Sequence, residues 1–87
     1  MAQPLTPEQR KILYRATHRG MKEADVLLGG FTAAKLSSLN QAETIALVAL
    51  LDELDADIMD WVMGRAPLPA RLDATLFAHV LAFKPYA

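Results

Sequence analysis

The stretch NQAETIALVALL (residues 40–51) predicts a helix at the centre of the molecule. Asn40 is a favourable residue for the N-cap position, and Glu43 completes a capping box three positions later. From position 45 to position 51 nearly every side chain is apolar, so this helix has no polar face to turn toward water. We therefore expect neighbouring helices to cover it on all sides.

The residues before this segment predict two further helices. A capping box at residues 6–9 starts a helix that runs to about His18. A second helix is expected over roughly residues 22–37. The pair Gly29-Gly30 costs this helix about 1 kcal/mol per glycine relative to alanine, which favours a kink or the close approach of another backbone. The positions expected on its buried face are Ala24, Leu27, Leu28, Phe31 and Ala34.

The residues after the central helix predict two more. Asp55 is expected to cap a helix that stops at Gly64, and a last helix is expected from about Ala70 onward, after a turn that contains two prolines. No stretch shows the alternating pattern of a strand. The sequence therefore predicts an all-α fold, a compact antiparallel bundle of about five short helices. We expect a single domain over residues 1–87, with its core at about residues 7–84.

The composition indicates a folded chain, with 53% hydrophobic and 22% charged residues. The sequence has no cysteine, which excludes disulfides and thiolate metal sites. The N-terminal segment lacks the apolar core of a signal peptide and the Arg- and Ser-rich pattern of a transit peptide. The most apolar run, TIALVALL, is too short to span a bilayer. We therefore expect a cytoplasmic protein with no membrane insertion.

Charge is unevenly distributed along the chain, although the net charge is only −1. Residues 1–22 contain five basic side chains and one acidic one, whereas residues 41–60 contain six acidic side chains and no basic one. The molecule should therefore have a basic end and an acidic end. The simpler interpretation is two solvated helix faces that attract each other weakly.

The sequence predicts no catalytic residues and no metal site. His18 and His79 are too few and too far apart to hold a metal ion, and His79 fits a core or boundary position on the last helix. The acidic run at residues 52–60 lacks the central glycine and terminal glutamate of a calcium-binding EF-hand loop, and no Ser–His–acid grouping stands out. Trp61 fits either a core residue or an anchor for a partner protein.

Residues 19–23, RGMKE, stand out because they join two helices without an ordinary cap for the second. One interpretation is a simple corner, in which Gly20 takes the left-handed conformation while Arg19 and Glu23 are solvated or paired with each other. The other is a docking element, since glycine lets another backbone approach and arginine binds carboxylate or phosphate oxygens. Side chains one turn earlier extend the patch: Tyr14, Arg15 and His18.

The segment LYRATHRGMKEADVLLGGF (residues 13–31) resembles the signature of the SdhE-type FAD assembly factors, called succinate dehydrogenase assembly factor 2 in mitochondria. The family pattern is Arg-Gly-x-x-Glu, then an aspartate, then an apolar helix that closes on a phenylalanine. The matching residues here are Arg19, Gly20, Glu23, Asp25 and Phe31. A second block, LLDELDADIMDWVMGRAPLP (residues 50–69), is similar to the family's leucine-rich helix, acidic turn, tryptophan and glycine-then-proline ending.

The resemblance implies a five-helix assembly factor that promotes covalent attachment of FAD to the flavoprotein subunit of succinate dehydrogenase, and in bacteria also of fumarate reductase. It implies no catalytic turnover by this chain and no stably bound cofactor, because FAD acts on the partner subunit. The expected flavinylation motif is Arg19, Gly20 and Glu23. The expected supporting interface is Tyr14, Arg15, His18, Met21, Lys22 and Asp25.

Two other classes of function stay open on the residues alone. The basic first helix, the Gly20 turn and the second helix could form a helix-turn-helix in a DNA-binding or antitoxin-like regulator. The second helix is poor in Arg, Asn and Gln, and the isoelectric point near 6.0 argues against binding nucleic acid. A structural helical subunit of a larger complex is the third class.

Overall fold

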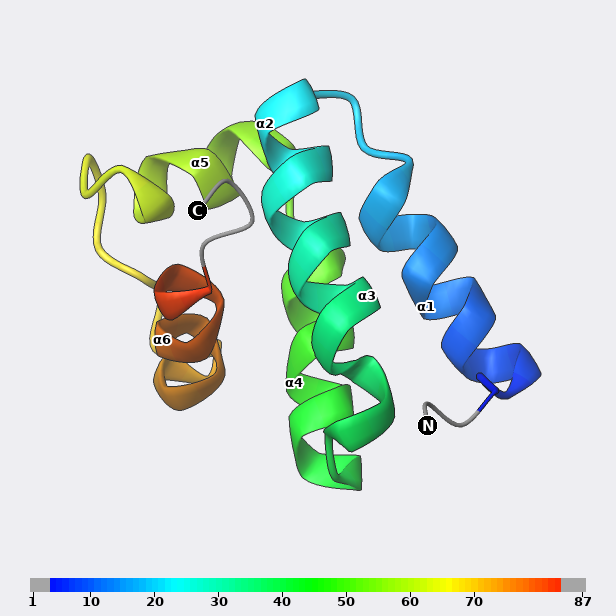
Figure 1. The fold of residues 1–87 in the computed structure, drawn as a ribbon. Helices are drawn as coiled ribbons and strands as arrows, with labels where there is room; N and C mark the ends of the chain where they lie inside the picture. The colour runs from blue at the N-terminus through cyan, green and yellow to red at the C-terminus, as the bar shows by residue number, and fades with distance from the viewer. Residues whose placement is uncertain (1–3, 84–87) are drawn as a thin grey trace.

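The computed structural model describes residues 4–83, which form a bundle of five helices without strands (Figure 1). One of these helices is continuous but changes type along its length, because a π-helical turn separates two short α-helical segments. The elements are α1 (Pro7–Thr17), α2 (Lys22–Ala24), the π turn η1 (Asp25–Gly29), α3 (Gly30–Lys35), the 3-10 turn η2 (Leu36–Ser38), α4 (Gln41–Leu51), α5 (Asp55–Val62) and α6 (Ala74–Ala82). The predicted all-α class is confirmed.

The helices pack around α4. Helix α1 contacts α3 and α4, α2 contacts α5, and α4 contacts α6. In Figure 1, α5 crosses the end of the bundle where α2 begins, and α1 and α6 lie on opposite sides of α4. The start of α2 and the start of α5 therefore meet at one end of the molecule. No helix within residues 4–83 is long and apolar enough to cross a membrane.

Local sequence signals place several helix ends correctly. The backbone N–H of Gln9 donates to the Thr6 hydroxyl at 3.1 Å, and the Gln9 side chain accepts from the Thr6 N–H at 2.9 Å. Asn40 and Glu43 form the same reciprocal pair, with both distances at 2.8 Å. Gly64 adopts a φ of 75° after α5, the left-handed conformation expected at a helix end. Both predicted capping boxes and the predicted stop at Gly64 are confirmed.

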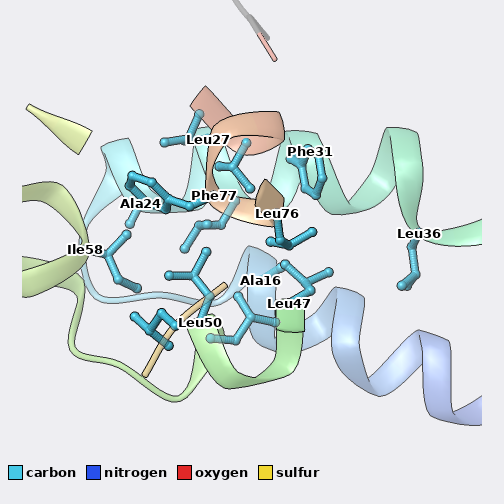
Figure 2. Packing of buried hydrophobic residues seen from close by; sticks show 14 residues of the cluster. Ala16, Ala24, Leu27, Phe31, Leu36, Leu47, Leu50, Ile58, Leu76 and Phe77 are labelled. Atoms are coloured by element: carbon cyan, nitrogen blue, oxygen red, sulfur yellow. The ribbon is translucent and has the colours of Figure 1, made fainter. Parts of the chain in front are cut away.

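The core lies between the inner faces of all five helices (Figure 2). Four of the five residues expected on the buried face of the second helix are buried, but Ala34 is exposed, so that part of the prediction is wrong. The π turn explains the error, since its extra residue rotates the following positions by about one residue. Thr32 and Leu36 are buried in addition to Phe31, whereas Ala34 faces solvent.

Gly29 lies where α1 presses against the π turn. A Cβ atom built on Gly29 would lie 2.9 Å from Thr17 Cγ2 and 3.3 Å from the carbonyl oxygen of Ala16. Any side chain at this position would push the two helices apart. The close approach of another backbone, predicted from the glycine pair, is confirmed at Gly29.

Three other expectations about the later helices need correction. Helix α4 buries its leucines but leaves Ile45 with 62% of its surface exposed, because only one side of its N-terminal half is covered. Helix α6 begins at Ala74 and not at Ala70, since Asp73 is the residue that accepts a capping hydrogen bond, from Leu76 N–H. His79 is exposed on α6, whereas Trp61 is half-buried and packs against the core.

Candidate functional site

The Arg19 side chain turns into the protein and binds the turn between α4 and α5. Its Nε donates to Asp55 Oδ1 at 2.6 Å. Its two terminal nitrogens donate to the backbone carbonyl oxygens of Leu51, at 2.7 Å, and Glu53, at 2.8 Å. The Arg19 side chain is only 10% exposed and that of Asp55 only 14%. The planar guanidinium therefore has its charge and most of its donors satisfied within the chain.

Asp55 binds the backbone of the corner as well as the arginine. Its Oδ2 accepts the N–H of Gly20 at 2.7 Å and the N–H of Met21 at 3.2 Å. Asp55 was expected to cap α5, but Leu54 occupies the N-cap position and Asp55 is the first helical residue, so that prediction is wrong. The competing interaction explains the difference, because the carboxylate is already engaged by three donors from the corner.

Burial and hydrogen bonding act in opposite directions on the pKa of Asp55. Desolvation is the largest single influence and raises this pKa. The hydrogen bonds from the Arg19 side chain and the Gly20 N–H, the positive charge of Arg19 and the Met21 N–H together outweigh it. The net result is a pKa below the ordinary value of 3.8, so Asp55 is ionised at neutral pH.

Gly20 does not have the backbone conformation expected of a helix-ending glycine. Among the described residues only Gly64 has a positive φ, so the left-handed assignment of Gly20 is wrong. The chain leaves α1 through His18 instead, at φ −122° and ψ 58°. A Cβ built on Gly20 would meet only Asp55 Oδ2, at an ordinary contact distance of 3.6 Å. Nothing inside the protein therefore requires a glycine at this exposed position.

The outward side of the corner carries the remaining motif residues. Lys22 and Glu23 are exposed at the start of α2, and the Glu23 side chain forms no hydrogen bond or ion pair with residues 4–83. The rings of Tyr14 and His18 stack with their centroids 3.8 Å apart and their planes 16° apart. His18 Nδ1 also lies 2.8 Å from the carbonyl oxygen of Tyr14, which holds the stack on the surface of α1.

The other predicted interface residues have internal contacts. The Asp25 carboxylate accepts the N–H of Arg19, so it closes the corner from the α2 side. Met21 is half-buried, packs against the core and occupies the N-cap of α2 without a side-chain capping bond. Arg15 forms an ion pair with Asp52 at the surface. All nine predicted residues therefore lie at one end of the bundle, some facing inward and some facing solvent.

Asp55 belongs to the site but was not among the predicted site residues, although the charge pattern of the sequence pointed to it. Arg15 pairs with Asp52 and Arg19 pairs with Asp55, so the basic first helix and the acidic α4–α5 turn meet at this site. The two regions are joined in the fold and do not form separate charged ends. The opposite charges of the two runs favour their contact, so the charge pattern could have pointed to Asp55 as a partner of the motif.

A shallow concavity of about 360 Å³ opens beside the corner. It lies between α1 and the α4–α5 turn and combines charged, aromatic and aliphatic walls. A larger concavity of about 480 Å³ lies between α3, α4 and α6 and shares no residue with it. The residues that line the smaller concavity are Tyr14, Arg15, His18, Arg19, Gly20, Glu53, Leu54 and Asp55.

The arrangement offers contacts for another molecule. Among residues 4–83 no group of three or more His, Asp or Glu side chains could hold a metal ion. The exposed groups are an aromatic stack at Tyr14 and His18, an open backbone at Gly20, and the opposite charges of Lys22 and Glu23. Aromatic side chains are enriched at protein–protein interfaces, and charged groups occur at their rims, so these groups could contact another protein.

Comparison with known proteins identifies the family. The family model described as "Flavinator of succinate dehydrogenase" matches residues 10–84. The chain is 37% identical over 65 residues to the FAD assembly factor SdhE of Acetobacter pasteurianus, an alignment that covers 75% of this chain and 60% of that protein. It is 37% identical over 70 residues to the mitochondrial succinate dehydrogenase assembly factor 2 of Saccharomyces cerevisiae, covering 77% of this chain and 43% of the relative.

These relatives are longer than the matched region, so the chain spans between two fifths and three fifths of their length. A further relative, the succinate dehydrogenase assembly factor 2 of Dictyostelium discoideum, is 32% identical over 72 residues, which cover 83% of this chain and 51% of that protein. The family model nevertheless matches most of the present chain, including the corner and the α4–α5 turn that Arg19 and Asp55 join. The chain therefore belongs to the family of succinate dehydrogenase flavinators.

Proposed function

We propose that this protein promotes the covalent attachment of FAD to the flavoprotein subunit of succinate dehydrogenase. The family match over residues 10–84 carries this proposal. The names of the relatives, FAD assembly factor and succinate dehydrogenase assembly factor, point to the same activity. In this proposal the flavoprotein subunit of fumarate reductase is a second binding partner. The protein acts in the cytoplasm.

The protein acts in this proposal as a docking partner without catalytic turnover of its own. FAD stays on the flavoprotein subunit, and this chain holds no cofactor stably. Covalent attachment requires a nucleophilic side chain of the subunit and the flavin ring to stay at reacting distance, and a bound partner can supply that order. The corner suits this role because Arg19 and Asp55 make it rigid while the motif residues around them stay exposed.

The motif residues divide into two groups by their contacts. Arg19 and Asp25 hold the corner from inside: Arg19 binds Asp55 at the α4–α5 turn, and Asp25, the first residue of η1, accepts the N–H of Arg19. Glu23 and Gly20 face solvent, and no internal contact explains either residue. We assign the direct contacts with the subunit to Gly20, Glu23, Lys22 and the stack of Tyr14 and His18. Gly20 lies where the subunit backbone comes closest in this proposal.

Reconstituted flavinylation tests the proposal. The apo-flavoprotein subunit is incubated with FAD and this protein, and covalent flavin is read as fluorescence in a denaturing gel. We expect Glu23→Ala and Gly20→Ala to lower the rate of covalent incorporation about tenfold, as loss of a central interface contact does, while the melting temperature stays within about a degree of wild type. Arg19→Ala should lower both the rate of covalent incorporation and the melting temperature, because it removes the internal contacts of the corner.

Two results would count against this function. One is a wild-type protein that leaves covalent flavin at the level of the subunit alone. The other is full activity of Glu23→Ala and Gly20→Ala variants that melt normally. The helix-turn-helix alternative receives no support from the family, and the guanidinium of Arg19 is bound internally and not free for phosphate.

A further inference from the structure

We propose that the concavity beside the corner binds an apolar side chain of the flavoprotein subunit, and that Leu54 is the residue of the α4–α5 turn that makes this contact. This inference rests on the proposed function and extends the docking surface beyond the Arg-Gly-x-x-Glu motif to a second segment of the chain. Leu54 lies 34 positions after Gly20 in the sequence and lines the same concavity.

Leu54 is poorly suited to its position in the fold. It is the N-cap residue of α5, where Ser, Thr, Asp or Asn would accept a hydrogen bond from the first turn, and it forms no such bond. The residue is 71% exposed, the most of any large hydrophobic residue within residues 4–83. The helix would gain from a polar cap, and the core gains little from this leucine. A contact outside the chain accounts for both features.

The surroundings of Leu54 form a site of the right shape for an apolar group. The concavity of about 360 Å³ is lined by Leu54, by the stacked rings of Tyr14 and His18, and by Gly20. Tyr14 is itself 62% exposed. Aromatic and aliphatic side chains around a shallow hollow are the usual setting for one anchoring side chain of a partner.

The charges of this surface favour an uncharged occupant. The four charged side chains that line the concavity, Arg15, Arg19, Glu53 and Asp55, are all paired within this chain. Arg15 pairs with Asp52, Arg19 with Asp55, and Glu53 with Arg71. A phosphate or a carboxylate would compete with the carboxylates that already neutralise the two arginines. An apolar side chain would cover the hollow without breaking any pair.

The surface is also held in place before a partner arrives. Asp55 follows Leu54 directly and binds Arg19 and the N–H of Gly20 at 2.6 and 2.7 Å. These bonds keep the turn that carries Leu54 beside the motif corner. Binding therefore costs little loss of conformational freedom in this chain.

A substitution at Leu54 separates this contact from folding. We expect Leu54→Ser to melt at the same temperature as wild type or higher, because serine caps a helix better than leucine does. The same variant should bind the immobilised apo-flavoprotein subunit at least about tenfold more weakly and slow covalent FAD incorporation to a similar degree. Leu54→Asn, which also caps α5, should behave in the same way.

Ile45→Ser is the matched control, since Ile45 is 62% exposed on α4 and does not line the concavity. It should bind and act as wild type does. The inference is overturned if Leu54→Ser binds normally, if Ile45→Ser loses binding equally, or if Leu54→Ser converts a wild-type dimer to a monomer in sedimentation, since a second copy would then be the occupant. If the wild-type protein promotes no covalent attachment of flavin, the proposed function fails. If the wild-type protein and Leu54→Ser promote it equally well, the proposed function stands and only the inference about Leu54 fails.

Discussion

At the scale of single residues, Asp55 is the side chain on which the corner depends. It accepts hydrogen bonds from Arg19 Nε and from the N–H groups of Gly20 and Met21, and it is 14% exposed. Removal of one partner from a mostly buried pair leaves the other charge without compensation, which is more costly than the loss of a surface pair. Loss of this one side chain, which lies outside the motif, should therefore destabilise the whole corner.

Asp55→Asn should lower the free energy of unfolding by about 2–4 kcal/mol, measured by urea denaturation at pH 7, because the Arg19 charge loses its counter-ion. Asp52→Asn is the control, since the pair of Asp52 with Arg15 is exposed at 62% and 40%. That variant should cost less than about 1 kcal/mol. Equal losses in the two variants would contradict the special position of Asp55.

The lowered pKa of Asp55 also predicts how stability depends on pH. A carboxyl group with a lower pKa in the folded state stabilises the fold fully above its unfolded pKa, near 3.8, and loses this contribution as the pH falls through the folded pKa. The free energy of unfolding of wild type should therefore fall more steeply below about pH 4 than that of Asp55→Asn. Parallel profiles from pH 6 to pH 2.5 would show that Asp55 is not the group responsible.

At the scale of the helices, the π turn and Gly29 set how α1 packs on the second helix. The turn shifts the buried positions after Gly29, and the glycine itself lets Ala16 and Thr17 approach. Both features occur where the motif corner joins the two helices. The packing of these helices therefore determines the direction in which the corner faces.

Gly29→Ala should destabilise the protein by about 1–3 kcal/mol, although alanine is the better helix former, because its Cβ would lie 2.9 Å from Thr17 Cγ2 and 3.3 Å from the Ala16 oxygen. Chemical denaturation followed by circular dichroism measures the difference. Gly20→Ala is the matched glycine substitution and should leave the midpoint unchanged, since its Cβ would have only an ordinary contact at 3.6 Å. A Gly29→Ala protein more stable than wild type would show that α1 can shift at no cost.

At the scale of the whole molecule, helices far apart in the sequence are bound into one unit. Arg15 and Arg19 join α1 to the α4–α5 turn, and the core contains residues of every helix. A domain of this size with one continuous core should unfold in a single cooperative step. The docking corner should then be as stable as the rest of the fold.

Two probes test this cooperativity. Trp61 is the single tryptophan and reports on α5, whereas circular dichroism reports on all helices. We expect the urea transitions from Trp61 fluorescence and from circular dichroism at 222 nm to coincide, as two-state unfolding requires. An earlier fluorescence transition would mean that α5 separates from α1 and α2 before global unfolding, and that the contact of Arg19 with Asp55 does not couple them.

The sequence by itself determined the helical class, the two capping boxes and the stop at Gly64, because these depend on neighbouring residues. For the pair Gly29-Gly30 it left a kink or a close contact open, and the structure shows the close contact at Gly29. The family pattern also identified the motif residues, which the structure then placed at one end of the bundle. Their assignment as an interface stays a prediction for the flavinylation experiment.

Only the tertiary structure decided which motif residues face inward. The partner of Arg19 lies 36 positions away, and no local rule says whether a guanidinium will meet a carboxylate of its own chain or one of another protein. The same packing exposed Ile45, which the apolar pattern of residues 45–51 had placed in a fully covered helix. Long-range contacts settle these questions because burial depends on where five helices meet, and that depends on the whole chain at once.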